Sequence, residues 1–302
     1  MTENMTAPKK PARTTLRDAL RHIQVEIASQ FAIDRTGITR RDVPARAKAA
    51  AWAAIVGVYV VGWSEGVRVA VAMLFGWSPV PDAWPTGTIP GRTANIVRDV
   101  AVVLIAAALI WAFRQYAGAA VQRATWKTSV RTFPVGYTAV FLGFSVAAGL
   151  STILGLPANE FVTQSIDDPL LTALNVINSG MAGPTEELAL LALVVVALRA
   201  TGHTWPVVVI AAIAVRVPFH LYYGWGAIGL AVWAALMVAL YKRTGAIVAI
   251  VLEHATFNML NYAGEIGGIL KTVFALAGFA IVMVIIGNRI GKREKEATAE
   301  KS

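Results

Sequence analysis

Five polar residues interrupt stretches of this chain that are otherwise apolar and helical in pattern. They are Glu186, Glu187, His220, His254 and Asn258. An ionisable side chain is costly in hydrocarbon, so one that persists there usually faces a bundle interior or a water-filled path. Carboxylates and imidazoles in such a place can activate water, bind a divalent metal or pass protons. We therefore treat the five residues as one candidate site.

The surrounding sequence is that of a polytopic membrane protein. Its 302 residues are 56% hydrophobic and 15% charged. A membrane-spanning helix needs about 20 mostly apolar residues, and the long apolar runs predict an all-α, integral membrane bundle of about eight transmembrane helices. The expected spans are 50–75, 95–113, 134–156, 183–199, 205–222, 225–241, 245–262 and 268–288. The absence of Cys excludes disulfides, thiolate metal sites and a Cys nucleophile.

The net charge of +9 is distributed in a way that predicts orientation in a membrane. The segment before the first span holds ten Lys and Arg against five acids, and basic residues recur at every second connection between spans. This alternation is the positive-inside pattern of a multi-pass protein of the cell membrane with both termini in the cytoplasm. The basic excess therefore indicates contact with membrane lipid, and no nucleic-acid partner is expected.

The predicted spans and the charged ends divide the chain into four parts. These are a basic cytoplasmic arm (1–49), three transmembrane helices (50–157), a catalytic helical core (158–290) and a charged cytoplasmic tail (291–302). Within the core, we expect 167–183 to be an outer-face helix or a re-entrant segment.

A helix is then expected to start at Gly183-Pro184, since Pro is favoured in a first turn. Glu186 and Glu187 would lie in that first turn, where the helix dipole favours negative charge. Compensation of the dipole is therefore one explanation of the acidic pair.

The polar residues are also expected to lie at one depth in the membrane. At 1.5 Å per residue from the cytoplasmic ends, the heights are about 20 Å for Glu186, 22 Å for His220, 14 Å for His254, 20 Å for Asn258 and 16 Å for Arg216. This band lies in the outer half of a hydrocarbon core about 30 Å thick. Three separate helices thus predict one meeting point.

Three segments that carry these residues resemble the three motifs of the CPBP (Abi) intramembrane proteases. That family includes the type II CAAX prenyl endopeptidases. The matching segments are Pro184-Thr-Glu186-Glu187, His220 and His254-Ala-Thr-Phe-Asn258. The resemblance covers about 183–262. The family patterns are Glu-Glu-x-x-x-Arg, Phe-x-x-x-His and His-x-x-x-Asn. Here Leu191 stands where the first pattern has Arg, and Arg216 where the second has Phe.

The resemblance implies a glutamate-type intramembrane endopeptidase that acts on a protein or peptide. Glu186 would activate a water, His220 would assist it, and His254 with Asn258 would stabilise the oxyanion. A carboxylate in a pocket of low dielectric is a better base than one in water, and donors aimed at an oxyanion are worth several kcal/mol.

The exchange at Leu191 and Arg216 yields one further expectation. A guanidinium in the membrane should not remain unpaired, so we expect Arg216 to pair with Glu187. That pair would leave Glu186 as the only free carboxylate.

Two alternatives stay open on the residues alone. Two His and two Glu could bind zinc, although the metal-free mechanism is favoured and no cofactor is expected. The same cluster could also serve a membrane protein that is not an enzyme, such as a proton- or ion-coupled transporter or an immunity scaffold.

Overall fold

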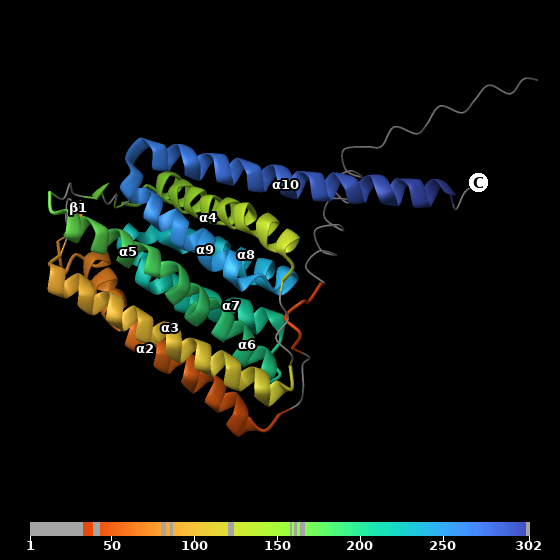
Figure 1. Ribbon diagram of the computed structural model, residues 1–302, viewed down its shortest axis with the longest axis horizontal. Coiled ribbons are helices and arrows are strands. Elements are labelled where there is room, and N and C mark those ends of the chain that lie inside the picture. The colour runs from red at the N-terminus through yellow and green to blue at the C-terminus, as the bar shows by residue number, and fades with distance from the viewer. Residues whose placement is uncertain are drawn as a thin grey trace, which may run out of the picture. The chain divides into compact units, whose positions relative to one another are not determined.

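The computed structural model describes residues 33–38, 43–79, 83–84, 87–119, 124–157, 159, 162–163 and 167–299. Two compact units are distinguished within the chain. Residues 34–282 form the helical bundle shown in Figure 1. Of the other unit, the structure describes Ile33 and residues 283–299, the last part of the final helix.

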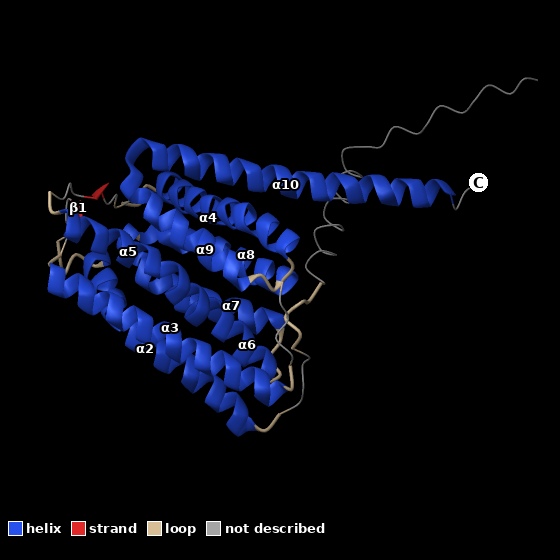
Figure 2. Ribbon diagram, viewed as in Figure 1, coloured by secondary structure: helices blue, strands red, loops and turns tan. Residues whose placement is uncertain are grey.

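The described residues are almost entirely helical, which confirms the all-α prediction (Figure 2). The helices are α2 (Ala45–Leu74), α3 (Ile89–Ala117), α4 (Trp126–Leu154), α5 (Pro169–Glu186), α6 (Leu193–Ala200), α7 (Trp205–His220), α8 (Leu230–Thr244), α9 (Ile247–Met259) and α10 (Gly264–Ala299). Short helical turns join several of them. The strands β1 (Ala83–Trp84) and β2 (Val162–Thr163), of two residues each, form one parallel pair.

The number of membrane passes agrees with the sequence prediction. Among the described residues, seven helical stretches are long and apolar enough to cross a membrane. The last stretch, Ile247–Lys292, contains both α9 and α10, and the chain turns back between them (Figure 1). Counted by direction, the bundle therefore has eight passes.

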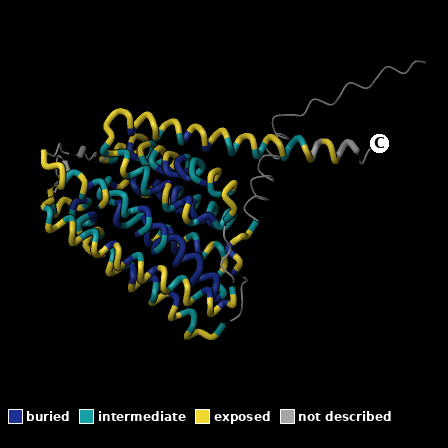
Figure 3. The backbone as a smooth tube through the Cα atoms, viewed as in Figure 1, coloured by how far each residue is buried: buried dark blue, intermediate teal, exposed yellow. Residues whose placement is uncertain are grey.

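The most deeply buried part of the bundle is the stretch that contains α6. All eight residues of α6 are buried, whereas many apolar residues of α2, α3 and α10 are exposed (Figure 3). Apolar side chains on the outside of a transmembrane bundle face lipid, so this distribution is expected of a membrane protein. Glu186 and Glu187 precede α6 in this stretch and are themselves buried in the bundle interior.

The helix that carries the acidic pair begins earlier than the sequence analysis predicts. Asp168 caps α5: its Oδ1 accepts hydrogen bonds from the backbone N–H groups of Leu170 at 2.8 Å and Leu171 at 3.1 Å, and Pro169 follows at the first helical position. Pro184 instead lies inside the helix. The prediction of a start at Gly183-Pro184 is therefore wrong, as is the explanation of the acidic pair as dipole compensation in a first turn.

Glu187 begins a π-helical turn, Glu187–Ala192, that joins α5 to α6. Such a turn inserts one residue into the hydrogen-bonding ladder and often occurs at functional sites. Pro184 lies just before it, and a Pro inside a helix removes one backbone hydrogen bond and crowds the preceding turn. The helix is thus irregular where it carries Glu186 and Glu187.

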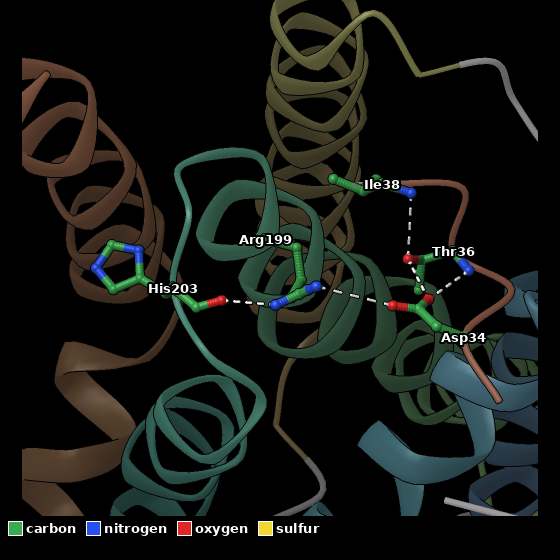
Figure 4. Close-up of polar contacts among 5 residues, drawn as sticks. All are labelled: Asp34, Thr36, Ile38, Arg199 and His203. Atoms are coloured by element: carbon green, nitrogen blue, oxygen red, sulfur yellow. Dashed lines mark hydrogen bonds and ion pairs between the residues drawn. The ribbon is translucent and has the colours of Figure 1, made fainter. Parts of the chain in front are cut away.

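Residues 34–38 close the end of the bundle at which α6 terminates (Figure 4). Arg199 of α6 donates to the carbonyl of His203 at 2.8 Å, and its Nη2 lies 3.9 Å from Asp34 Oδ2. Ile38 is buried against Ala117, Val196 and Ala200. Arg199 thus lies in the last turn of α6, twelve residues after Glu187.

The helices α7 and α8 are about half as long as α2, α3 and α4. They have 16 and 15 residues, against 30 in α2 and 29 in both α3 and α4. The turn between them begins directly after His220, the last residue of α7. Asn159, from the connection between α4 and α5, holds this turn through hydrogen bonds to the carbonyls of Tyr222 at 2.7 Å and Tyr223 at 3.1 Å.

Candidate active site in the bundle interior

Glu187 is the centre of a buried polar cluster. Its side chain is 0% exposed, and its Oε1 accepts hydrogen bonds from Arg216 Nη1 at 2.8 Å and His254 Nδ1 at 2.7 Å. Arg216 is 2% exposed, so the pair is fully removed from solvent and lipid. The predicted Glu187–Arg216 pair is thus confirmed. One carboxylate joins α7 and α9 to the π-helical turn.

A close crossing of α5 and α9 makes this contact possible. Gly183 lies against the backbone of α9, and a Cβ added to it would come within 2.5 Å of the Val251 carbonyl oxygen and 2.6 Å of the Ala255 nitrogen. Only glycine permits two helices to approach so closely. Because Gly183 is one turn before Glu187 on α5, this crossing brings Glu187 within reach of His254.

His220 joins the cluster through its own helix and through Trp233 of α8. Its Nδ1 donates to the carbonyl oxygen of Arg216 at 2.8 Å, because a carbonyl oxygen can only accept. Its Nε2 therefore remains as the acceptor of the neutral ring. Trp233 stands between the two imidazoles, with its ring centroid 5.7 Å from that of His220 and 5.2 Å from that of His254. The same indole lies 4.3 Å from the guanidinium carbon of Arg216.

Glu186 differs from its neighbour in having no bonded partner. It is 8% exposed, and its buried Oε2 has no hydrogen-bond partner among the described residues. It nevertheless interacts electrostatically with His254 and Arg216. A carboxylate that lies near the cluster but is not bonded within it can accept a proton from a water or a substrate.

Asn258 makes the fewest contacts with the other candidate residues. It lies one turn after His254 on α9 and is half-buried. Its backbone carbonyl accepts a hydrogen bond from Ser179 Oγ at 3.2 Å, but its amide side chain bonds to no other described residue. The structure therefore places Asn258 beside the cluster rather than within it.

Glu253 belongs to the same buried region and is absent from the candidates found in the sequence. It is 0% exposed, and neither carboxylate oxygen has a partner among the described residues. It interacts electrostatically with Glu187 and Arg216, and a Cβ added to Gly136 of α4 would lie 2.7 Å from its Oε2. The expectation that Glu186 is the only free carboxylate is therefore wrong. Its position inside an apolar run, directly before His254, was the signal that could have found it.

The side chains do not form an evident metal site. Among the residues that the structure describes, no group of three or more His, Cys, Asp or Glu is arranged to hold a metal ion. Glu187 Oε1 already accepts from a guanidinium and an imidazole, and a positively charged guanidinium beside a zinc ligand would oppose metal binding. The donor set present therefore does not fit zinc.

The two fully buried acids should respond differently to a neutral replacement. Glu187→Gln removes the charge that holds Arg216 and should cost about 3–5 kcal/mol of unfolding free energy. Glu253→Gln should cost none, because no described donor depends on its charge. Unfolding of both variants in the same detergent measures the difference. Equal losses in the two variants would contradict this assignment of partners.

One of three comparisons with known proteins returned a match. Residues 168–260 match the family model described as type II CAAX prenyl endopeptidase Rce1-like. The matched segment begins at the cap of α5 and includes all the candidate site residues. Neither the comparison with curated proteins nor that with solved structures returned a match. The match supports a membrane endopeptidase of the CAAX type in general, and residues 168–260 are thus similar to the CPBP family, to which that family model belongs.

Proposed function

We propose that the chain is a glutamate-type intramembrane endopeptidase in which Glu186 activates the attacking water. The observation that carries this proposal is that two adjacent acids differ in their hydrogen bonding. Glu187 is bonded to Arg216 and His254, whereas Glu186 lies beside them without a bonded partner. One acid thus organises the cluster, and the other remains available as a base.

The geometry supports the following sequence of steps. Glu186 takes a proton from water as the water oxygen attacks the peptide carbonyl carbon, and His220 Nε2 accepts the second water hydrogen to orient it. The proton then passes from Glu186 to the leaving nitrogen as the C–N bond breaks. For this role both ring nitrogens of His254 would carry a proton, with Nδ1–H donated to Glu187 and Nε2–H donated to the negative oxygen formed in between. The amide of Asn258 would donate to the same oxygen.

We expect His254→Ala and Asn258→Ala each to lower turnover by about 10²-fold or more, the usual cost of losing an oxyanion donor. His254→Ala should also weaken folding, because Glu187 then loses one of its two partners. Asn258→Ala should leave folding intact, since no described residue bonds to its amide. Steady-state kinetics with a melting curve for each variant measures both effects, and undiminished turnover in both would contradict the roles.

The competing function is a proton- or ion-coupled transporter. The unbonded, fully buried Glu253 is the observation that favours it, because isolated carboxyl groups in a bundle interior are typical of proton relays. Purified protein in detergent with a peptide library, and the same protein in liposomes with a pH-sensitive dye, decide between them. Peptide cleavage without proton flux supports the endopeptidase, and flux without cleavage supports the transporter.

The orientation of the chain gives the site an expected side of access. We propose that the site opens towards the outer leaflet, which makes prenylated substrates at the cytoplasmic face unsuitable. Gly224 lies in the turn next to the site, but its φ of 94° and its burial make it a poor position for a cysteine.

Asp167, exposed beside the cap of α5, is better suited as a probe. The chain has no native Cys, so Asp167→Cys should react with an impermeant thiol reagent in intact cells. Lys127→Cys, exposed at the start of α4, should react only after lysis. The reverse pattern would overturn the proposed orientation.

A further inference from the structure

Two tyrosines follow the histidine of α7 and form a short 3₁₀ turn beside the candidate site. The turn is Leu221–Tyr223, and it begins directly after His220. Tyr222 and Tyr223 belong to none of the three family patterns, because the second pattern ends at His220 and the third begins at His254. Their side chains are half-buried, and the proposed hydrolysis steps give them no role.

This turn holds both phenol rings next to the imidazole of His220. The ring centroid of His220 lies 6.1 Å from that of Tyr222 and 6.3 Å from that of Tyr223, and the planes of the imidazole and the Tyr223 ring differ by 13°. The centroids of the two phenol rings are 4.2 Å apart. Asn159 bonds to both backbone carbonyls of the pair, and Phe144 of α4 contacts the Tyr223 ring at 5.6 Å. The hydroxyl groups are therefore held at a fixed place relative to His220.

The two hydroxyl groups lie near the carboxylate that we assign as the base. A side-chain hydrogen bond joins Tyr222 to Tyr223, and each of them interacts electrostatically with Glu186. A hydroxyl group has one O–H donor. Two hydroxyls that bond to each other use only one of their two hydrogens in that bond, so the other hydrogen can be donated to a further acceptor. The pair thus brings an O–H donor close to both Glu186 and His220.

A water that attacks a peptide carbonyl has one direction that Glu186 and His220 leave unused. In the proposed steps its two O–H bonds point to Glu186 and to His220 Nε2, and one lone pair attacks the carbonyl carbon. The second lone pair can accept a hydrogen bond, and a bound water is best held when most of its four directions have partners. A hydroxyl donor near both Glu186 and His220 suits this lone pair.

We propose that the hydroxyl pair of Tyr222 and Tyr223 is a further catalytic group, which donates a hydrogen bond to the oxygen of the attacking water. This bond fixes the orientation of the water, so that its other lone pair points to the peptide carbonyl carbon. The tyrosines keep their protons throughout, and the proton balance of the hydrolysis is unchanged. The inference rests on the proposed endopeptidase function, because Glu186 and His220 bind the same water in those steps.

Removal of both hydroxyls tests the proposal in the kinetics of cleavage. The double variant Tyr222→Phe/Tyr223→Phe keeps both rings against His220, so its melting curve and its KM should match those of the wild type. Its kcat should fall about tenfold, as expected for the loss of one hydrogen bond to the reacting water. Tyr116→Phe is the matched control, because Tyr116 is exposed on α3, and it should retain the kcat of the wild type. An undiminished kcat in the double variant, or a loss that appears only in KM or in the melting curve, would overturn the inference and leave the endopeptidase function standing.

A crystal structure of the wild-type protein that resolves water decides the question without cleavage. It should show a water within about 3.2 Å of a Glu186 carboxylate oxygen, of His220 Nε2 and of a hydroxyl oxygen of Tyr222 or Tyr223. The double variant should lack this water or hold it elsewhere. The expected pair of structures supports the role of the tyrosines even if the wild type cleaves no peptide, a result that would count against the endopeptidase function alone. Tyrosine hydroxyls that contact no water bound to Glu186 would overturn the inference.

Discussion

Arg216→Leu is expected to unfold more readily than the wild type by about 3–5 kcal/mol and to be inactive. The substitution leaves the fully buried Glu187 without its cationic partner and removes the cation that lies over Trp233. It leaves Glu187 with His254 alone, so the ring that we assign to the oxyanion is also disturbed. Thermal unfolding in detergent, followed by intrinsic tryptophan fluorescence, measures the loss.

Arg68→Leu provides the matched control for that experiment. Arg68 pairs with Glu65 on α2, but both side chains are about two-thirds exposed. An exposed ion pair contributes little to stability. This variant should therefore unfold at the same temperature as the wild type. A fully stable and active Arg216→Leu protein would show that the buried pair is dispensable.

A second variant tests the same prediction at Leu191, where the family pattern has an arginine. Leu191 lies in the π-helical turn that begins at Glu187 and is 1% exposed. In the Arg216→Leu background, Leu191→Arg should restore part of the lost stability, because it returns a guanidinium to the helix that carries Glu187. The single variant Leu191→Arg should instead destabilise, since it buries a second cation in a packed core.

The fold could be predicted where it depends on hydrophobicity and charge alone. Apolar length sets the number of spans, so eight passes follow from the sequence. The course of the chain from Asp168 to Ala192 did not follow, because a proline in an apolar stretch predicts a helix start at Pro184, whereas Pro184 lies inside α5. The combination of Asp168 with Pro169 is the better start signal, since it supplies both a capping carboxylate and a first-turn proline.

The candidate site could be predicted in part for the same physical reasons. The pairing of Glu187 with Arg216 follows from the cost of an unpaired charge in an apolar medium, and the structure confirms it. The contact of Trp233 with both histidines did not follow, because an indole in an apolar run resembles ordinary packing. Glu253 was missed although its charge in an apolar span was visible. The assignment of catalytic roles remains a proposal.

Glu186→Gln is expected to abolish proteolysis and to leave folding unchanged. Glutamine fills the same volume but cannot take a proton from water at neutral pH. No described residue donates a hydrogen bond to Glu186 Oε2, so no buried partner is left unpaired by the change. This separates Glu186 from Glu187, whose replacement by Gln should reduce folding and activity together.

The most direct test of the account is the rate of peptide-bond cleavage by wild-type and Glu186→Gln proteins, purified in the same detergent and matched in folded concentration. Mass spectrometry of the products identifies the bond that is broken. The account predicts cleavage by the wild type and none by Glu186→Gln, with melting curves that coincide. Cleavage by Glu186→Gln at the rate of the wild type would contradict the claim that Glu186 activates the water.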